Sequence, residues 1–378
     1  MNKKLLFTMT LTFVVIIMLS VTMNVQRVEA SDTVFIRADG SIEPSTTANI
    51  TSSDNITYTL TDNIYDSIVV QKDNIILDGA GYIVQGTATG SGIYLAGTSN
   101  VTIQNIEIRD FVDGIYLWHC RDITVSRNNI TENNNRGINV YEDCNGTAMC
   151  GNNIVNNDRG IEIEDGMHMI YHNNFMGNAK HVKALVYSSN IWDNGVEGNY
   201  WSNYTGVDLD AGGDGIGDSS HVIDANNQDN YPLMGSINFI DAGTWDEVAH
   251  YVHTASNSTV SDFYFDPDEG TFIRFNVTGL DGTSGFCRVA IPKELLWCES
   301  IYDWIVRVNG TSVPFRIQEY PDYTYFYFTY SHSIQEVEIF GTGVIPEFPA
   351  WASTLLVLAV LTIAMAICRV KLLKTPIH

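Results

Sequence analysis

The sequence predicts an all-β protein in which a right-handed parallel β-helix is followed by a β-sandwich. Three observations support this prediction: a phrase that recurs along the chain, apolar residues that alternate at period two within each phrase, and a change of pattern after residue 235. The recurring phrases begin at Gly92, Gly114, Gly137 and Gly160, so the period is about 22 to 23 residues. A fixed period of this size is typical of stacked units that bury their apolar faces only against their neighbours.

Each phrase holds short strands and leaves no room for a helix. The alternating apolar residues of the first strand are Ile93 and Leu95, Ile115 and Leu117, Ile138 and Val140, and Ile161 and Ile163. A second short strand follows, and the frame of a leucine-rich repeat is absent, which leaves a parallel β-helix with one coil per phrase. An Asn before an apolar residue closes each phrase, at Asn105, Asn129, Asn153 and Asn174. We expect these side chains to stack as a structural ladder.

The composition bounds the class of protein and its partners. The 378 residues are enough for two domains, and 45% hydrophobic with 17% charged residues is ordinary for a globular protein. The formal net charge of -24 repels polyanions, so we expect no nucleic-acid partner.

Both ends of the chain predict an extracellular location. Lys3 and Lys4 precede an apolar run, and Ala30 ends the polar stretch after it, which predicts a signal peptide over residues 1–30; an uncleaved anchor is the alternative. Residues 348–368 carry no charge and predict a transmembrane helix, followed by a basic cytoplasmic tail over 369–378. The body of the protein is then expected outside the cell, anchored by the C-terminal segment. Glycosylation sequons agree with this, at Asn49, Asn55, Asn100, Asn129, Asn145, Asn203, Asn257, Asn276 and Asn309.

The β-helix is predicted over residues 31–235, with a polar cap to about Thr61 and an acidic closing loop over 207–224. The repeat decays into the runs NYWS from Asn199, DGIGD from Asp214 and YPL from Tyr231. With the Asn-cornered coils, these runs resemble the NosD-like family, whose coils are also called carbohydrate-binding and sugar-hydrolase repeats. The resemblance covers about Asp54 to Met234 and implies a pectin-lyase-like solenoid, with a link to copper-site maturation.

A β-sandwich is predicted over residues 236–343, where longer segments alternate and Asn309-Gly310 marks a hairpin turn. About a hundred residues of this kind favour an immunoglobulin-like sandwich that presents the β-helix. Residues 344–347 form a linker, and the run VIPEFP from Val344 before an apolar span and a basic tail resembles the PEF-type C-terminal sorting signals of archaeal surface proteins. That resemblance implies exchange of the span for a lipid anchor; a plain membrane anchor is the alternative.

Four acidic residues of the closing loop predict a structural calcium site. Asp208, Asp210, Asp214 and Asp218 offer carboxylate oxygens on a Gly-rich loop, which Ca²⁺ prefers, and they would repel one another without a cation. The spacing departs from that of an EF-hand, so an exposed acidic loop is the alternative.

Alternation predicts a carbohydrate-binding face on the first strands. If the Ile residues point inward, then Tyr94, Tyr116, Asn139 and Glu162 form one outward row, and Trp118, Tyr141 and Glu164 form a second. Aromatic rings stack on the apolar faces of sugars while acids bind hydroxyls. The alternative is that these side chains stack for stability alone.

Two other functions stay open. Glu162 and Glu164 would lie about 6 to 7 Å apart by strand rise, close to the carboxyl separation of inverting glycosidases of about 6.5 to 9.5 Å. Any pair of acids spaced this way gives that distance, so we favour no catalysis, with a polysaccharide hydrolase, lyase or epimerase as the alternative. Copper handling is the third hypothesis, on candidates for which we expect core packing instead: Met167, His168, Met169, His172, Met176 and His181.

Cysteine usage fits an oxidising exterior. Cys287 and Cys298 lie on either side of a short segment of the sandwich and predict a disulfide. Cys120 and Cys144 lie at nearly the same place on neighbouring coils, where a second disulfide can form; Cys144 with Cys150 is the rival pairing. The leading hypothesis from the sequence is a surface protein that binds carbohydrate or envelope polymer.

Overall fold

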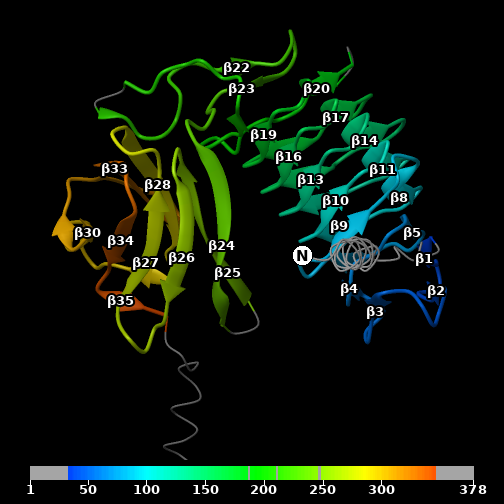
Figure 1. Ribbon diagram of the computed structural model, residues 1–378, viewed down its shortest axis with the longest axis horizontal. Helices are drawn as coiled ribbons and strands as arrows, with labels where there is room; N and C mark the ends of the chain where they lie inside the picture. Colours follow the sequence, from blue (N-terminus) through cyan, green and yellow to red (C-terminus); the bar gives the residue numbers. More distant parts are fainter. Residues whose placement is uncertain (1–32, 186–187, 210–211, 246–247, 346–378) are drawn as a thin grey trace, which may run out of the picture.

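The computed structural model describes residues 33–185, 188–209, 212–245 and 248–345, and its elements within them are β-strands (Figure 1). The predicted signal peptide, transmembrane segment, cytoplasmic tail and sorting motif lie outside these residues, apart from Val344 and Ile345 at the beginning of that motif. No helix in the described part of the chain is long and apolar enough to cross a membrane.

The first half of the chain is a right-handed β-helix of about six turns with three mostly parallel sheets. Sheet A holds β1 (Val34–Ile36), β2 (Ile42–Glu43), β5 (Ile68–Val70), β8 (Ser91–Ala96), β11 (Asp113–Trp118), β14 (Arg136–Tyr141), β17 (Arg159–Ile163) and β20 (Lys180–Ala184). Sheet B holds β3 (Ile50–Thr51), β4 (Thr57–Leu60), β6 (Ile75–Asp78), β9 (Val101–Gln104), β12 (Thr124–Ser126), β15 (Ala148–Cys150) and β18 (Met169–Tyr171). Sheet C holds β7 (Ile83–Gln85), β10 (Glu107–Arg109), β13 (Asn129–Thr131), β16 (Asn153–Val155), β19 (Asn174–Met176) and β21 (Tyr200–Trp201).

Each of the predicted phrases is one coil, with one strand in each sheet. The predicted inward residues Ile93, Ile115, Ile138 and Ile161 are paired in register and fully buried. The glycine that begins each phrase is required by close packing between coils. A Cβ atom at Gly114 would lie 2.6 Å from the carbonyl oxygen of Gly137 on the next coil, which no side chain tolerates.

Buried Asn ladders support two corners of the coils, but the main one is not where the sequence predicts it. Asn129, Asn153 and Asn174 do stack in register. The continuous ladder runs one residue earlier, where each side-chain amide donates to the next Oδ1 through Asn128, Asn152, Asn173 and Asn199 at 2.9 to 3.1 Å. A second ladder joins three residues: Asn133 donates to Asn157 Oδ1, and Asn157 donates to Asn178 Oδ1, each at 3.0 Å.

The equivalence assigned to Asn105 is wrong by two positions. Ile108, not Ile106, pairs with Ile130, and Asn105 stands at a left-handed corner with a φ of 56°.

The last coil is closed by aromatic side chains and a short hairpin. Trp201 is buried and stacks on Phe175 with 4.3 Å between ring centroids, and His221 stacks at 4.5 Å on Trp201. His221 belongs to β22 (His221–Val222), which pairs with β23 (Gln228–Asp229). Asp229 ends the main Asn ladder, because its carboxylate accepts hydrogen bonds from Asn199 N at 2.7 Å and from Trp201 Nε1 at 2.8 Å.

The second half of the chain is a β-sandwich of two five-stranded antiparallel sheets. Sheet D holds β24 (Ser236–Trp245), β25 (Val248–Ser256), β28 (Ser284–Pro292), β32 (Arg316–Glu319) and β33 (Tyr323–Ser331). Sheet E holds β26 (Thr259–Phe265), β27 (Phe272–Thr278), β30 (Ile305–Val308), β31 (Thr311–Ser312) and β34 (Gln335–Phe340). A separate pair joins β29 (Leu296–Trp297) and β35 (Gly343–Val344). The predicted turn at Asn309-Gly310 is present, since it joins β30 to β31. The immunoglobulin-like classification stays a prediction.

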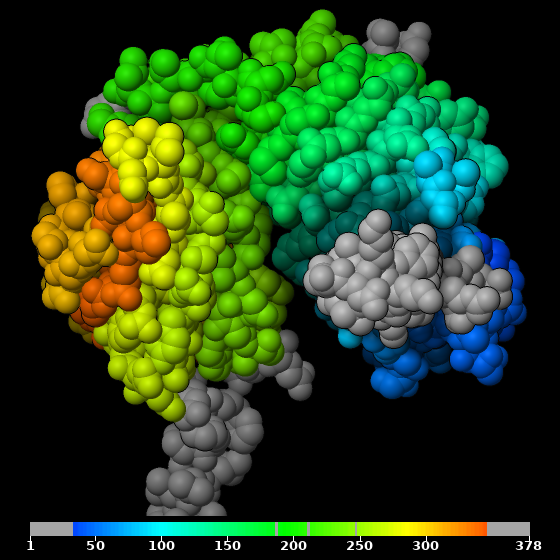
Figure 2. Space-filling model, viewed as in Figure 1, coloured from blue at the N-terminus to red at the C-terminus, as the bar shows by residue number. Residues whose placement is uncertain are grey.

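The sandwich is attached to the end of the β-helix by polar contacts. Asn174 donates its side-chain amide to the carbonyl oxygen of Ile237 at 2.7 Å and accepts from Ile237 N at 2.8 Å, so it acts as a strand partner for β24. Figure 2 shows the segment that follows β20 lying across the upper ends of both units. Arg288 donates to the carbonyl oxygen of Asp214 at 3.0 Å and Arg316 donates to that of Gly213, which fixes the acidic loop on sheet D.

Candidate functional site

The predicted outward rows are present on sheet A. Tyr94, Tyr116, Asn139 and Glu162 follow one another in register, and Trp118 pairs with Tyr141 in the second row. The rings are close enough to interact: 5.5 Å separates the centroids of Tyr94 and Tyr116, and 5.9 Å those of Tyr116 and Tyr141. These strands therefore bring the aromatic residues together as one surface.

The polar end of this face differs from the expectation of freely exposed acids. Trp118 and Tyr141 are 37% and 38% exposed, whereas Asn139 and Glu162 are only 2% and 8% exposed. Glu164 is half-buried and accepts a hydrogen bond from Glu142 N at 3.2 Å. The ring surface offered to a ligand comes from Tyr94, Tyr116, Trp118 and Tyr141, and cations cover Glu162 beside it.

Three cations bind Glu162. Arg136 and Arg159 each place a nitrogen 2.7 Å from Oε2, and Lys183 Nζ lies 2.5 Å from Oε1. Arg136 also bridges to Asp113 at 3.1 Å. Burial raises the pKa of Glu162, but these hydrogen bonds and charges outweigh it and lower the pKa to about 2. A general acid in glycoside hydrolysis needs a raised pKa, so Glu162 is not suited to that role.

The predicted calcium ligands in the described residues fold their loop through backbone amides. Asp208 accepts from Gly215 N at 2.8 Å and from Asp214 N at 3.0 Å, Asp214 accepts from Ile216 N at 3.0 Å, and Asp218 accepts from Leu209 N at 2.9 Å. Burial raises the pKa of Asp208, and Asp214 and Asp218 add to this. Asp210 lies outside the described residues. The calcium site stays a prediction.

The cysteines of the described residues are free thiols in this structure. Cys120 and Cys144 are adjacent on neighbouring coils as predicted, and Cys120 N donates to Cys144 Sγ at 3.3 Å. Cys287 is buried in the sandwich core, where burial raises its thiol pKa, and Cys298 packs at the edge of that core. Neither predicted disulfide is formed here, and both pairings stay predictions.

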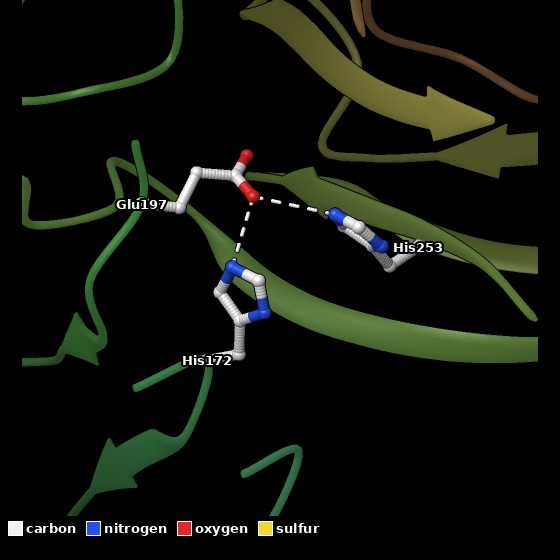
Figure 3. Close-up of side chains that lie close together, drawn as sticks. All are labelled: His172, Glu197 and His253. Atoms are coloured by element: carbon white, nitrogen blue, oxygen red, sulfur yellow. Dashed lines mark hydrogen bonds and ion pairs between the residues drawn. The ribbon is translucent and has the colours of Figure 1, made fainter. Parts of the chain in front are cut away.

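A buried cluster that the sequence did not predict lies where the β-helix meets the sandwich. His172 follows β18 at a coil corner, Glu197 precedes β21, and His253 and Arg288 lie on β25 and β28. The side chains are between 1% and 5% exposed. His172 Nε2 lies 2.9 Å and His253 Nε2 3.3 Å from Glu197 Oε2, so both rings turn toward one oxygen (Figure 3).

Arg288 fixes the other oxygen of Glu197. Its Nε donates to Oε1 at 2.5 Å, and its guanidinium lies 4.5 Å over the ring of Tyr325. Burial raises the pKa of Glu197, but the Arg288 charge and the two histidines hold it well below its usual range. Burial lowers the pKa of His172, yet hydrogen bonds with Cys150 and Glu197 raise it to about 9. Burial lowers the pKa of His253 despite its bond to Glu197, so His172 carries the proton of the pair.

No short sequence motif predicts this cluster, because its residues are far apart in the chain. His172 and His253 lie 25 and 56 positions from Glu197 in the sequence. His172 was one of the sequence candidates for copper, but its partners come from the irregular segment and from the sandwich. His168 is buried as expected, and its Nε2 bonds with the carbonyl oxygen of Asp165 at 2.9 Å.

A cavity of about 360 Å³ lies beside the cluster. It is lined by residues of both units, among them Cys150, Tyr171, His172, His253 and Tyr323. Figure 3 shows that the two imidazoles approach Glu197 from different elements. The cavity therefore borders both imidazoles of the buried cluster.

A protein family and a solved structure are similar to this chain. The family described as periplasmic copper-binding protein (NosD) matches residues 15–206, just over half of the 378 residues. No curated protein matches the chain. Among solved structures, the crystal structure of Dettilon tailspike protein (gp208) matches at 12% identity with a TM-score of 0.23, over 74% of this chain and 68% of that one.

Proposed function

The chain belongs to the NosD family, and from the geometry of sheet A we propose that it is an extracellular surface protein that binds carbohydrate or an envelope polymer. The family is described as periplasmic, which agrees with a location outside the cytoplasm. The observation that supports the binding role is the face formed by Tyr94, Tyr116, Trp118 and Tyr141.

The rings repeat with the coils. A polymer that runs along the β-helix axis would pass rings on successive coils, whose centroids lie 5.5 and 5.9 Å apart, so several sugar units can contact aromatic side chains at once. Arg136 lies beside the rings, is only half-buried and can donate hydrogen bonds to hydroxyl groups, while buried Asp113 holds it in place. Repeated weak stacking along a rigid surface gives affinity without a deep pocket, because little conformational entropy is lost in the protein.

A glycan array probed with the full chain tests this proposal. We expect a defined set of polysaccharides to bind, and Trp118→Ala to weaken that binding about tenfold, which is about 1.4 kcal/mol. Trp297→Ala is the matched control, since Trp297 is also 37% exposed but lies on the sandwich. Equal losses in both variants, or no glycan bound by folded protein, would contradict the proposal.

Copper handling is the second candidate, because one described group of residues fits a transition metal. The sequence candidates do not gather: Met167 and Met169 are exposed, and His168 is bonded within its own turn. His172 instead joins Glu197 and His253, and imidazole with carboxylate suits Cu²⁺ and Zn²⁺. The residues present therefore fit the ion that the family description names.

A further inference from the structure

The metal-compatible group joins the two units of the chain. His172 and Glu197 come from the β-helix and its closing segment, and His253 comes from the sandwich, beyond the matched residues 15–206. Their ligand atoms all lie within 4.8 Å of one another. Within the residues the structure describes, they are the one group of three or more His, Cys, Asp or Glu side chains this close.

The distances already approach those of a coordination shell. Metal bonds of about 2.0 to 2.2 Å at tetrahedral angles separate neighbouring donor atoms by roughly 3.3 to 3.6 Å. The two imidazole nitrogens lie 2.9 and 3.3 Å from Glu197 Oε2, so the first has to move by about 0.4 to 0.7 Å and the second by at most about 0.3 Å. Movements of that size are within ordinary side-chain adjustment.

The residues around Glu197 fix the position of its carboxylate. Arg288 occupies Oε1 and leaves Oε2 facing the histidines, which is the role that outer hydrogen bonds play around metal ligands. Arg288 is itself oriented by Asp214 O and Gln318 Oε1, at 3.0 and 3.3 Å. The charge of Arg288 weakens the attraction of Glu197 for a cation, so the two imidazoles have to supply much of the affinity, and His172 has to lose its proton when the ion binds.

The open side of the group faces the cavity. Cys150, Tyr171 and Tyr323 line it together with both histidines, so an ion in the cavity would meet both imidazole rings. Cys150 also hydrogen-bonds with His172. A thiol at this edge favours copper over harder ions such as Mg²⁺.

We propose that His172, Glu197 and His253 form a transition-metal site, with Cu²⁺ bound most tightly of the divalent first-row ions, and that the bound ion ties the sandwich to the β-helix. This inference rests on the copper-handling candidate and is independent of the carbohydrate face. It assigns that candidate a place at the junction of the β-helix and the sandwich. One ion then has ligands from both units, so its binding strengthens their attachment.

Metal titration of the full chain, stripped with chelator and purified in detergent, tests the site. We expect one Cu²⁺ per chain to remain after desalting, a thermal midpoint higher by several degrees, and X-ray absorption with two imidazole ligands and a carboxylate oxygen. His172→Gln and His253→Gln each should weaken binding at least 100-fold. His250→Gln is the matched control, because His250 is also buried on β25.

Three outcomes would overturn the site. Copper retained equally by both variants means that the chain handles copper elsewhere, which spares the copper-handling candidate and ends this assignment. No copper retained by the folded wild type ends both. Absorption spectra of the wild type without imidazole ligands also end the assignment, and this measurement does not depend on whether the variants fold.

Discussion

At the scale of residues, the first position of each phrase requires glycine because the backbone of the next coil lies too close for a side chain. Replacing Gly114 by Ala would place a Cβ 2.6 Å from Gly137 O, so neighbouring coils have to move apart. We expect Gly114→Ala to reduce the free energy of unfolding by about 3 kcal/mol, in the range of overpacked cores. Chemical denaturation monitored by circular dichroism measures this.

Gly97→Ala provides the comparison. Gly97 has a φ of 67° and no atom within 4 Å of a built Cβ, so only the left-handed backbone of Ala contributes, about 1 kcal/mol. If both substitutions reduced stability equally, spacing between coils would not explain the repeat.

Asp229 gives a pH dependence at the same scale. Burial raises its pKa to about 6 from 3.8, although Trp201 and Asn199 donate hydrogen bonds to it. Because this pKa is raised in the folded protein, protonated Asp229 makes its full contribution to the free energy of unfolding below pH 3.8. That contribution is lost as the pH rises through 6.

The measurement compares the wild type with Asp229→Asn, which does not titrate. Between pH 6 and pH 4 the wild type should gain stability relative to the variant, by at most about 1.4 kcal/mol per pH unit. A constant difference across this range would show that Asp229 is not the titrating group.

Alternation predicted which sheet A residues point outward, but not how exposed they are. Tyr94 and Glu162 occupy the same row, and only the second is covered. The cover comes from Arg136, Arg159 and Lys183, whose long side chains bend along the sheet. The alternation of residues determines on which face of a strand a side chain lies, whereas the path of an Arg side chain depends on charges on neighbouring coils.

At the scale of elements, two neighbouring Asn residues contribute differently to the Asn ladder. Asn152 is buried and donates to Val125 O at 2.8 Å and to Asn173 Oδ1 at 2.9 Å, while Asn153 is half-buried. We expect Asn152→Ala to reduce the free energy of unfolding by about 2 to 4 kcal/mol, because buried partners on two coils lose their hydrogen bonds.

Asn153→Ala is the matched control, with an expected loss of about 1 kcal/mol or less. Thermal unfolding of the two variants side by side measures the difference. If Asn153→Ala were the more destabilising variant, the main ladder would be the row of Asn129, Asn153 and Asn174, as the sequence predicted.

The coils could be predicted because their signals are local. A period of about 22 to 23 residues and the alternation of Ile115 with Leu117 report on neighbours a few positions away. The ladder was misplaced because Asn128-Asn129 and Asn152-Asn153 are doublets, in which only one Asn turns inward. A doublet gives no sequence signal for which member faces the core.

At the scale of the whole molecule, the acidic loop crosses from the β-helix to the sandwich. If Asp208, Asp210, Asp214 and Asp218 hold Ca²⁺ as predicted, the ion organises that crossing. We expect chelator to lower the thermal midpoint and added Ca²⁺ alone to restore it, with no restoration in Asp214→Asn. A midpoint in wild-type protein that does not respond to Ca²⁺ would contradict the calcium prediction.

The junction could not be predicted from the sequence. Glu197 and Arg288 are 91 positions apart, and their contact depends on how the sandwich settles on the last coil. The separate patterns of the two units carry no information on that docking. The buried cluster therefore appears only once both units are placed in space.

The equivalence of the coils has a consequence for the length of the tyrosine face. Duplicating residues 137–159 would insert one further rung, with its own Gly, Asn152 and Asn157 equivalents, and would lengthen sheet A by about 4.8 Å. The attachment of the sandwich at Asn174 and beyond would keep its present contacts. The length of the binding face can therefore change in steps of one coil, while the junction between the β-helix and the sandwich stays the same.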